Sequence, residues 1–353
     1  MEGPLKGYHH ETYAFPLPDA NGGVGAVRWK CREPRPGILW FDRRSFASEA
    51  ALIRALAGHV SSVPEIMEVD GIGLQRFIEG RTLGSYGQPG VPVAEPHMAQ
   101  IARLFSELAA ISPDVLPLDR QPSDAGRVTE KAADGDSAGF AACLIRFTEE
   151  RVYREQLPVY GRLFETLGVT EDGLLRLRER ARSLTSRPFQ LLHGDLHREN
   201  FIVDGDDRLW TIDWELAMFG DPLYDLGTHL HLMRYPAEQE AVVALRWRDT
   251  VEAVRPGSSR GWQEDLPYVL QFKRAQSVYT DVIRSALAVG GGRKLDRRLL
   301  PAASRKLHDV LGRAGTALGL TAVPSVRQIA KALTDWHREH GAADRGNVTP
   351  YAP

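Results

Sequence analysis

The sequence lacks what secreted, membrane-spanning or disulfide-bonded proteins usually carry. Cys31 and Cys143 are its only cysteines, and their wide separation argues against a disulfide scaffold or a zinc site and fits a reducing compartment. It contains no run of the roughly 18 apolar residues that a membrane-spanning helix needs, and residues 1–13 lack the apolar stretch of a secretion signal. We therefore expect a cytoplasmic protein with no membrane contact.

Excess charge and basic runs are also absent. The 44 lysines and arginines nearly balance the 46 aspartates and glutamates, which leaves a net charge of -2 and no electrostatic footprint for nucleic acid. With 353 residues and 43% hydrophobic content, the chain can bury the core of one large domain or of two lobes. We expect no nucleic-acid partner, and the sequence leaves the oligomeric state open.

A G-x-G-x-x-G phosphate loop is missing as well, and the residues that could carry chemistry gather between Gln190 and His231. Residues 189–192 predict a short buried strand. The turn at Gly194 would then present Asp195 at the end of that strand. A carboxylate in this place could act as general base toward a substrate hydroxyl.

A β-hairpin is predicted directly after this turn. Residues 201–203 and 208–214 read as two strands, and Asp204-Gly205-Asp206-Asp207 reads as the turn between them. The hairpin would bring Asn200 and Asp213 together at its open end. Their oxygen atoms are ligands of the kind that Mg²⁺ prefers alongside nucleotide phosphates. Asp221-Pro222 then indicates the start of a helix, with the aspartate as its N-cap.

The segments HGDLHRENFIVD, IDWELA and GDPLYDL resemble the signature of aminoglycoside phosphotransferases and choline kinase relatives, which share the protein-kinase-like fold. The resemblance implies that Asp195 is the catalytic aspartate and that Asn200 and Asp213 are the metal ligands. It also implies supporting positions, which are His193 as the brace of the catalytic loop, His197 and Glu215 without a separate chemical step, and Asp221 and Asp225 as structural residues.

The expected fold class is α+β and bilobal: a small N-terminal lobe with an antiparallel sheet and one helix, and a larger, mainly helical C-terminal lobe. We place the lobes at residues 1–80 and 81–353. Residues 11–17 and 25–31 flank a turn-rich connector and predict an antiparallel pair. In kinases a lysine on such a strand pairs with phosphates and with a glutamate of the next helix.

Lys30 is our candidate for that lysine, with Arg28 as the alternative, because both lie on the polar face of the second strand together with Arg32. The helix predicted for residues 45–57 supplies Glu49 as the expected ion-pair partner. A solvent-exposed polar strand face would explain the same pattern without any ligand.

Arg76, Phe77 and Ile78 resemble the hinge segment that offers backbone groups to a purine. Such groups do not reveal whether ATP or GTP is the donor. The family covers the phosphates with a loop between its first two strands, and Gly7–Thr12 stands in that place, with Tyr8, His9 and His10 as weak candidates for phosphate or base contact. Residues 112–139 form a long polar segment that could shape the acceptor pocket.

Most of the remaining chain predicts helices. Apolar residues at helical spacing mark residues 97–111, and the stripe of Met98, Ile101, Leu104, Phe105 and Leu108 is assigned to the core. Further helical runs separated by glycine and proline cover residues 140–167, 171–184, 238–254, 266–289, 295–318 and 325–340. The tail from residue 342 is polar and predicts a frayed end.

A two-metal phosphoesterase is a different interpretation, because Gly194-Asp195-Leu196-His197 also resembles the G-D-x-H opening of such enzymes. The further motifs that they need are missing from the sequence. His229 and His231 stand two residues apart on a predicted helix, so they would point to different faces. We therefore prefer the phosphotransferase.

The predicted function is transfer of the γ-phosphoryl group of ATP or GTP, with Mg²⁺, to a hydroxyl of a small molecule. The resemblance implies an antibiotic, aminoglycoside-like or nucleoside-type, whose phosphorylation would confer resistance. Arg246, Arg248, Arg274 and Arg284 favour a less cationic acceptor than an aminoglycoside. Two alternatives stay open: a metabolic kinase for a choline-like alcohol, and a kinase-fold protein that binds nucleotide without turnover.

Overall fold

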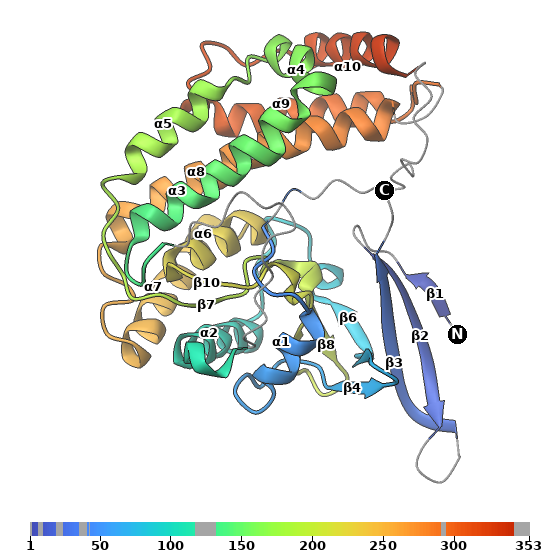
Figure 1. Cartoon of the computed structure of the whole chain (residues 1–353), viewed down its shortest axis with the longest axis vertical. Coiled ribbons are helices and arrows are strands. Elements are labelled where there is room, and N and C mark those ends of the chain that lie inside the picture. The colour runs from blue at the N-terminus through green and yellow to red at the C-terminus, as the bar shows by residue number, and fades with distance from the viewer. Residues whose placement is uncertain are drawn as a thin grey trace. The chain divides into compact units, whose positions relative to one another are not determined.

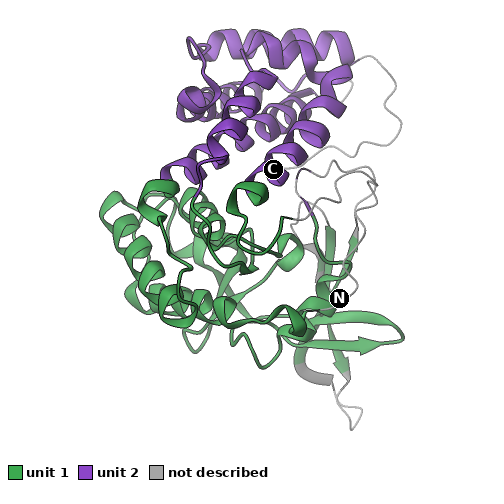
Figure 2. Ribbon diagram, turned by 60° about the vertical axis from the view of Figure 1, so that its left-hand side comes forward, with its two compact units in different colours: residues 1–34, 44–140, 185–266 green, residues 35–43, 141–184, 267–353 purple. Residues whose placement is uncertain are grey.

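The computed structural model describes residues 2–5, 10–18, 24–34, 41, 43–116, 132–290 and 294–341. The chain forms two compact units, coloured separately in Figure 2. Unit 1 consists of residues 1–34, 44–140 and 185–266, and unit 2 consists of residues 35–43, 141–184 and 267–353. Each of these units combines several segments of the chain, whereas the predicted lobes are two continuous segments divided at residue 80. The division into lobes stays a prediction.

Unit 1 begins with an antiparallel sheet whose strands run in the order β1-β2-β3-β5-β4. Figure 1 shows β2 and β3 as its two long strands. In their register Ala14 lies opposite Lys30, and Lys30 lies opposite Gln75 of the next strand. Lys30 therefore belongs to a central strand. The bounds are β1 Glu2–Leu5, β2 His10–Pro18, β3 Val24–Pro34, β4 Ile66–Val69 and β5 Ile72–Arg76.

Helix α1 (Glu49–Leu56) lies between β3 and β4 in the sequence. It starts four residues later than predicted, because Ser48 is its N-cap: the Ser48 side chain accepts the N–H of Ala51. This places Glu49 in the first turn, where its charge suits the positive end of the helix. Leu52, Ile53 and Leu56 form the buried face of α1.

The further described elements that lie wholly in unit 1 include two small antiparallel sheets and the helices α2, α6 and α7. One sheet has the order β6-β8-β9 and the other pairs β10 with β7. The predicted hairpin is present, with Phe201 opposite Thr211 and Val203 opposite Leu209. The bounds are β6 Gly80–Thr82, α2 Glu95–Ala110, β7 Gln190–Leu192, β8 Phe201–Asp204, β9 Leu209–Thr211, β10 Met218–Gly220, α6 Pro222–Met233 and α7 Ala237–Val254.

Unit 2 is helical in its described residues. The bounds of its helices are α3 Ser137–Phe147, α4 Leu157–Thr166, α5 Glu171–Ala181, α8 Trp262–Gly290, α9 Leu300–Leu318 and α10 Val326–His340, of which α3 and α8 begin in unit 1. A π-helical turn, Thr148–Tyr153, follows α3. Aromatic contacts fill the core: Tyr279 lies edge-on to Tyr153, and Tyr160 stacks on Trp336.

Most predicted elements are therefore present, and the apolar stripe of α2 is buried as expected. The predicted helix 140–167 is instead interrupted by the π-helical turn and a short 3₁₀ turn. Residues 117–131 of the predicted acceptor loop, Tyr8 and His9 of the predicted phosphate loop, and the tail from residue 342 lie outside the described residues. Across the described ranges, no helix is long and apolar enough to cross a membrane.

Candidate active site

The turn after β7 is fixed from behind by a buried carboxylate. Asp225 of α6 is fully buried and accepts the backbone N–H groups of His193 and Gly194, at 3.1 and 2.8 Å. Gly194 has a φ of 81°, and a Cβ at this position would come within 2.7 Å of the Leu216 carbonyl oxygen. Only glycine fits such a backbone without strain. The turn that presents Asp195 is thus rigid.

Contacts to the Asp195 carboxylate converge on one of its oxygen atoms. Asn200 Nδ2 donates to Asp195 Oδ2 over 3.0 Å and to the Asp195 carbonyl over 2.9 Å, and His197 Nε2 lies 3.3 Å from the same Oδ2. His197 Nδ1 accepts the N–H of Glu199, so Nε2 carries the proton and donates to Asp195. The arrangement leaves Oδ1 of Asp195 for the hydroxyl of an acceptor.

Electrostatics keep Asp195 ionised. Burial opposes its charge, but the hydrogen bond and charge of His197 outweigh burial and hold the pKa of Asp195 below its ordinary value. The same pair acts on His197, whose pKa is raised because Asp195 outweighs the effect of burial. An ionised Asp195 can accept a proton from a hydroxyl.

His193 braces the loop as a neutral imidazole. Burial lowers its pKa to about 4. Its Nδ1 accepts the backbone N–H of Asp195 over 3.3 Å, so Nε2 is the protonated nitrogen and donates to the Ile212 carbonyl over 3.2 Å. His193 therefore ties the catalytic turn to the end of β9.

Asn200 and Asp213 both stand at the open end of the hairpin. The N–H of Ile212 donates to the Asn200 carbonyl over 3.0 Å, which places the next residue, Asp213, beside Asn200. Asp213 has a φ of 66°, a strained conformation for a residue with a side chain. Burial disfavours its charge, but Arg32 and Lys30 outweigh this effect and lower its pKa.

These two side chains fit a magnesium ion. The amide nitrogen of Asn200 is engaged by Asp195, so its Oδ1 is the atom left for a cation, and Asp213 offers a charged oxygen. Within the described residues, no three His, Cys, Asp or Glu side chains are grouped as metal ligands. An ion at this point would take its other ligands from phosphates and water, which is how Mg²⁺ usually binds.

The ion pair between β3 and α1 exists, but with a different cation from the one predicted. Glu49 Oε2 lies 2.8 Å from Arg32 Nη1, and Glu49 Oε1 accepts the N–H of Trp214. The predicted Lys30 lies two residues earlier on the same strand face. Because α1 begins at Glu49, the end of β3 that carries Arg32 meets its first turn, and Arg32 takes the carboxylate.

Lys30 is nevertheless placed in a way that suits a ligand. Its side chain is buried, and burial together with the charge of Arg32 lowers its pKa to about 7. Glu49 and Asp213 act in the opposite direction, so both carboxylates are within electrostatic reach of Lys30. A phosphate brought to this site would offset the unfavourable burial of the ammonium.

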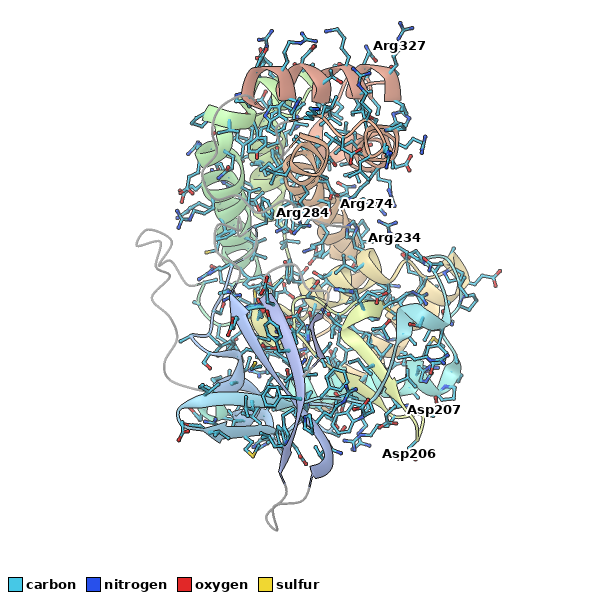
Figure 3. All side chains as sticks on the ribbon, turned by 90° about the vertical axis from the view of Figure 1, so that its right-hand side faces the viewer. Asp206, Asp207, Arg234, Arg274, Arg284 and Arg327 are labelled. Carbon is cyan, nitrogen blue, oxygen red and sulfur yellow. The ribbon has the colours of Figure 1, made fainter. Side chains whose placement is uncertain are left out.

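The three predicted hinge residues, Arg76, Phe77 and Ile78, line a cavity of about 190 Å³. Arg28 lines it too: its guanidinium lies 4.3 Å from the centre of the Phe77 ring and pairs with Glu79 at 2.6 Å. Other lining residues come from the hairpin turn, whose tip carries Asp206 and Asp207 in Figure 3. Arg28 therefore lies beside the predicted hinge residues, whereas Arg32 pairs with Glu49.

Glu215 and Asp221, the remaining predicted residues, lie in different networks. Glu215 contacts His10 at 2.7 Å, Arg44 at 2.5 Å and Arg32 at 3.2 Å, which places it beside Asp213. Asp221 caps α6 through the N–H of Leu223, as predicted, and in addition binds the fully buried Arg187. Asp221 therefore supports the fold behind the site.

The chain matches a known protein family. Residues 4–257, more than half of the chain, match the phosphotransferase enzyme family, abbreviated APH. The chain belongs to this family. The predicted relationship to aminoglycoside phosphotransferases and choline kinases, and the α+β kinase-like fold class with its small N-terminal sheet and mainly helical remainder, are thereby confirmed.

Three solved structures resemble this phosphotransferase at low identity. A thermostable mutant of the aminoglycoside phosphotransferase APH(4)-Ia has 15% identity, a TM-score of 0.48 and coverage of 90% of this chain and 94% of that chain. A choline/ethanolamine kinase family protein from Mesorhizobium loti has 17% identity and a TM-score of 0.43, and the match covers 93% of this chain and 90% of that chain. The macrolide 2'-phosphotransferase MphH from Brachybacterium faecium has 15% identity and a TM-score of 0.44, and the match covers 91% of this chain and 95% of that chain. The family assignment rests on the sequence match alone.

Sequence reasoning missed the part that Arg32 plays in this phosphotransferase. The strand pattern placed Arg32 on the same face as Lys30, and the family analogy then selected the lysine. Arg187 was missed entirely, although it binds Asp221 and Asp265 at full burial. Nothing in the local sequence separates a buried arginine of this kind from an exposed one.

Proposed function

We propose that this protein is a Mg²⁺-dependent O-phosphotransferase that moves the γ-phosphoryl group of ATP or GTP to a hydroxyl of a small molecule. The observation that carries the proposal is the arrangement of Asp195, Asn200 and Asp213. Asn200 Nδ2 donates to Asp195 Oδ2 over 3.0 Å, and the backbone hydrogen bond from Ile212 to Asn200 puts the next residue, Asp213, at the same end of the hairpin. One carboxylate oxygen thus faces an acceptor beside an oxygen-lined site for a cation.

The residues divide the transfer step between them. The acceptor oxygen attacks the γ-phosphorus, the bond from that phosphorus to the β–γ bridging oxygen breaks, and Asp195 Oδ1 takes up the hydroxyl proton. Asn200 and Asp213 would hold Mg²⁺, whose charge offsets that of the phosphate oxygens when it is bound. His197 keeps Asp195 ionised and in place. Catalysis would come from positioning and charge.

The hinge cavity supports a purine nucleotide as donor. Its volume of about 190 Å³ suits a flat ring system, and the Arg28 and Phe77 pair provides a surface on which such a ring can stack. On β3 the cations Arg28, Lys30 and Arg32 follow at every second residue, about 7 Å apart along the strand. They lead from the hinge cavity to the carboxylates, a spacing that accommodates a triphosphate.

For the acceptor we propose an antibiotic that carries a hydroxyl group, aminoglycoside-like or nucleoside-type, with a choline-like metabolic alcohol as the alternative. Two of the four arginines that favoured a less cationic acceptor are already in ion pairs. Arg246 pairs with Glu95 at 2.7 Å and Arg248 with Asp249 at 2.5 Å, so these two arginines are engaged elsewhere. Phosphorylation of an antibiotic in the cytoplasm would make resistance the biological role.

The test is phosphoryl transfer from ATP and from GTP, with Mg²⁺, to a panel of aminoglycoside, macrolide, nucleoside and peptide antibiotics and choline-like alcohols, measured by product mass. Asp195→Asn is the matched control, because it keeps the shape of Asp195 and removes the base. We expect one acceptor to gain a single phosphoryl group with the wild type and almost none with the variant. Equal product from both would contradict the role of Asp195.

A protein that binds nucleotide without turnover predicts a different result. It would be stabilised by nucleotide and Mg²⁺ in a thermal-shift assay and would phosphorylate no compound of the panel. Against this alternative stand Asp195, Asn200 and Asp213, since a catalytically silent kinase fold usually lacks its base or a metal ligand. Stabilisation combined with a phosphorylated product would exclude it.

A further inference from the structure

Arg32 is the point at which three distant parts of unit 1 meet. Its Nη1 lies 2.8 Å from Glu49 Oε2 of α1, 3.2 Å from Asp213 Oδ1 and 3.2 Å from Glu215 Oε1, both of which follow β9. Burial works against the charge of Arg32, but these three carboxylates outweigh it and raise the pKa above its ordinary value. The guanidinium is therefore permanently positive.

The hydrogen-bond partners of this guanidinium are unevenly distributed over its nitrogen atoms. All three carboxylates contact the single nitrogen Nη1, which has only two hydrogen atoms. Arg32 Nε is buried and makes no hydrogen bond within the described residues. A buried donor without a partner is costly, so a ligand that brings hydrogen-bond acceptors to Arg32 Nε would stabilise the side chain in this position.

The position also conflicts with the proposed metal site. Mg²⁺ binds its oxygen ligands at about 2.0–2.1 Å and carries two positive charges. Arg32 Nη1 already lies 3.2 Å from Asp213 Oδ1. A metal ion at that oxygen and the guanidinium in its present place would repel each other strongly and compete for the same carboxylate.

We propose that Arg32 takes the place of the divalent cation at Asp213 while the protein is free of ligand, and turns to the nucleotide phosphates when metal and nucleotide bind together. The inference rests on the proposed function for the role of Asp213 as a metal ligand. It assigns Arg32, two residues beyond the predicted Lys30, as the cation of the γ-phosphate end. Phosphate oxygens would then satisfy its unused donors.

A thermodynamic consequence follows. Free metal must displace Arg32 without offering it a new partner, whereas a metal–nucleotide complex supplies phosphates in exchange. Binding of metal and nucleotide is therefore positively coupled, and each raises the affinity of the other. The device keeps the site from being occupied by metal alone.

The test uses Mn²⁺ as the probe and the full-length protein without nucleotide. Binding is measured from the electron paramagnetic resonance signal of the free ion. We expect the variant Arg32→Met to bind Mn²⁺ about tenfold more tightly than the wild type, because it removes a unit charge in contact with Asp213. With nucleotide, metal and the identified acceptor, the same variant should lose about 10²-fold in kcat/KM, since it lacks a phosphate contact.

Three further variants make the result specific. Arg28→Met changes the same residue type on the same strand face, but next to Glu79, and should leave the Mn²⁺ affinity of the nucleotide-free protein unchanged. Arg32→Lys keeps the charge, so the Mn²⁺ affinity of this variant without nucleotide should stay close to that of the wild type. In the double variant Arg32→Met, Asp213→Asn, the gain in Mn²⁺ affinity should disappear. If Arg32→Met fails to fold, Arg32→Gln replaces it with the same expectation.

Unchanged or weaker Mn²⁺ binding by Arg32→Met would overturn the inference, and so would a gain that survives in the double variant. The outcome is separable from that of the proposed function. Tighter Mn²⁺ binding by Arg32→Met, combined with no phosphoryl transfer by the wild type to any acceptor, would support the inference about Arg32 and contradict the proposed phosphotransferase activity. Transfer by the wild type without the change in Mn²⁺ affinity would do the reverse.

Discussion

Arg187 and Arg32 of unit 1, one fully buried and the other half-buried, behave in opposite ways. Arg187 has no exposed side-chain surface, and each of its nitrogens has a partner: Nε and Nη2 bind Asp221, while Nη1 binds Asp265 and the Arg260 carbonyl. Arg32 directs one nitrogen at three carboxylates and leaves another nitrogen buried without a partner. The first arrangement is complete without a ligand, and the second is not.

The two arginines differ in the roles that we assign to them: Arg187 supports the fold, and Arg32 is proposed to contact a ligand. A saturated network such as that of Arg187 fixes the start of α6 and hence Asp225, which holds the catalytic turn. An unsaturated cluster such as that of Arg32 stores unfavourable free energy that a ligand can release. The unpartnered Nε of Arg32, next to Asp213, is therefore the feature on which the proposed role of this arginine rests.

The largest expected effect lies on the saturated side. Arg187→Met would leave Asp221 and Asp265 buried without their partner, and should lower the free energy of unfolding by about 3–5 kcal/mol. Chemical denaturation measures this. Arg182→Met is the control, because the exposed Arg182 and Glu179 pair should contribute less than about 1 kcal/mol. Similar losses in both variants would erase the distinction between the two kinds of arginine.

The next effect lies on the functional side. Asp213→Asn keeps the shape of the side chain and removes its charge, and should lower kcat by about 10²–10³-fold, because the charge that holds the metal at the phosphates is lost. The unfolding free energy should change little, because the side chain of Asp213 is 38% exposed and keeps its shape. Steady-state kinetics and denaturation test both halves, and a large loss of stability with normal kcat would contradict them.

A smaller effect concerns pH. Burial lowers the pKa of His229 from 6.5 to about 4, and its neutral ring donates from Nδ1 to the Leu196 carbonyl and accepts at Nε2 from Tyr235. Below pH 6.5 the unfolded state gains a proton that the folded state refuses, so stability falls on acidification until about pH 4. Between pH 7 and 5 this amounts to about 2 kcal/mol.

The variant His229→Gln isolates that contribution. It should be less stable than the wild type at pH 7, because the two hydrogen bonds of the ring are disturbed, and the deficit should shrink by about 2 kcal/mol at pH 5. Denaturant titrations at the two pH values measure it. A deficit that does not change with pH would show that His229 is not buried in its neutral form.

The part of the site that the sequence predicts is local. Asp195, Asn200 and Asp213 stand within one short segment, and a single hairpin register brings them together. Turn residues and alternating apolar residues encode that register directly. The N-cap role of Asp221 was predicted for the same reason, because capping depends only on the next few residues.

The part that the sequence does not predict depends on long-range packing. Whether Lys30 or Arg32 meets Glu49 depends on how α1 packs against β3, and the local sequence of neither element specifies this packing. The burial of Arg187 depends on Asp265, which lies 78 residues further along the chain. Neither relation leaves a periodic or motif signal in the sequence.

The most direct test of the account is the anomalous difference map of crystals grown with Mn²⁺ and a non-hydrolysable ATP analogue. We predict one peak at about 2.1 Å from an oxygen of Asp213 and from Asn200 Oδ1, with Asp195 in its present place and Arg32 moved from Asp213 to the phosphates. A metal peak away from Asp213 and Asn200, with Arg32 still on Asp213, would contradict both the proposed site and the role of Arg32.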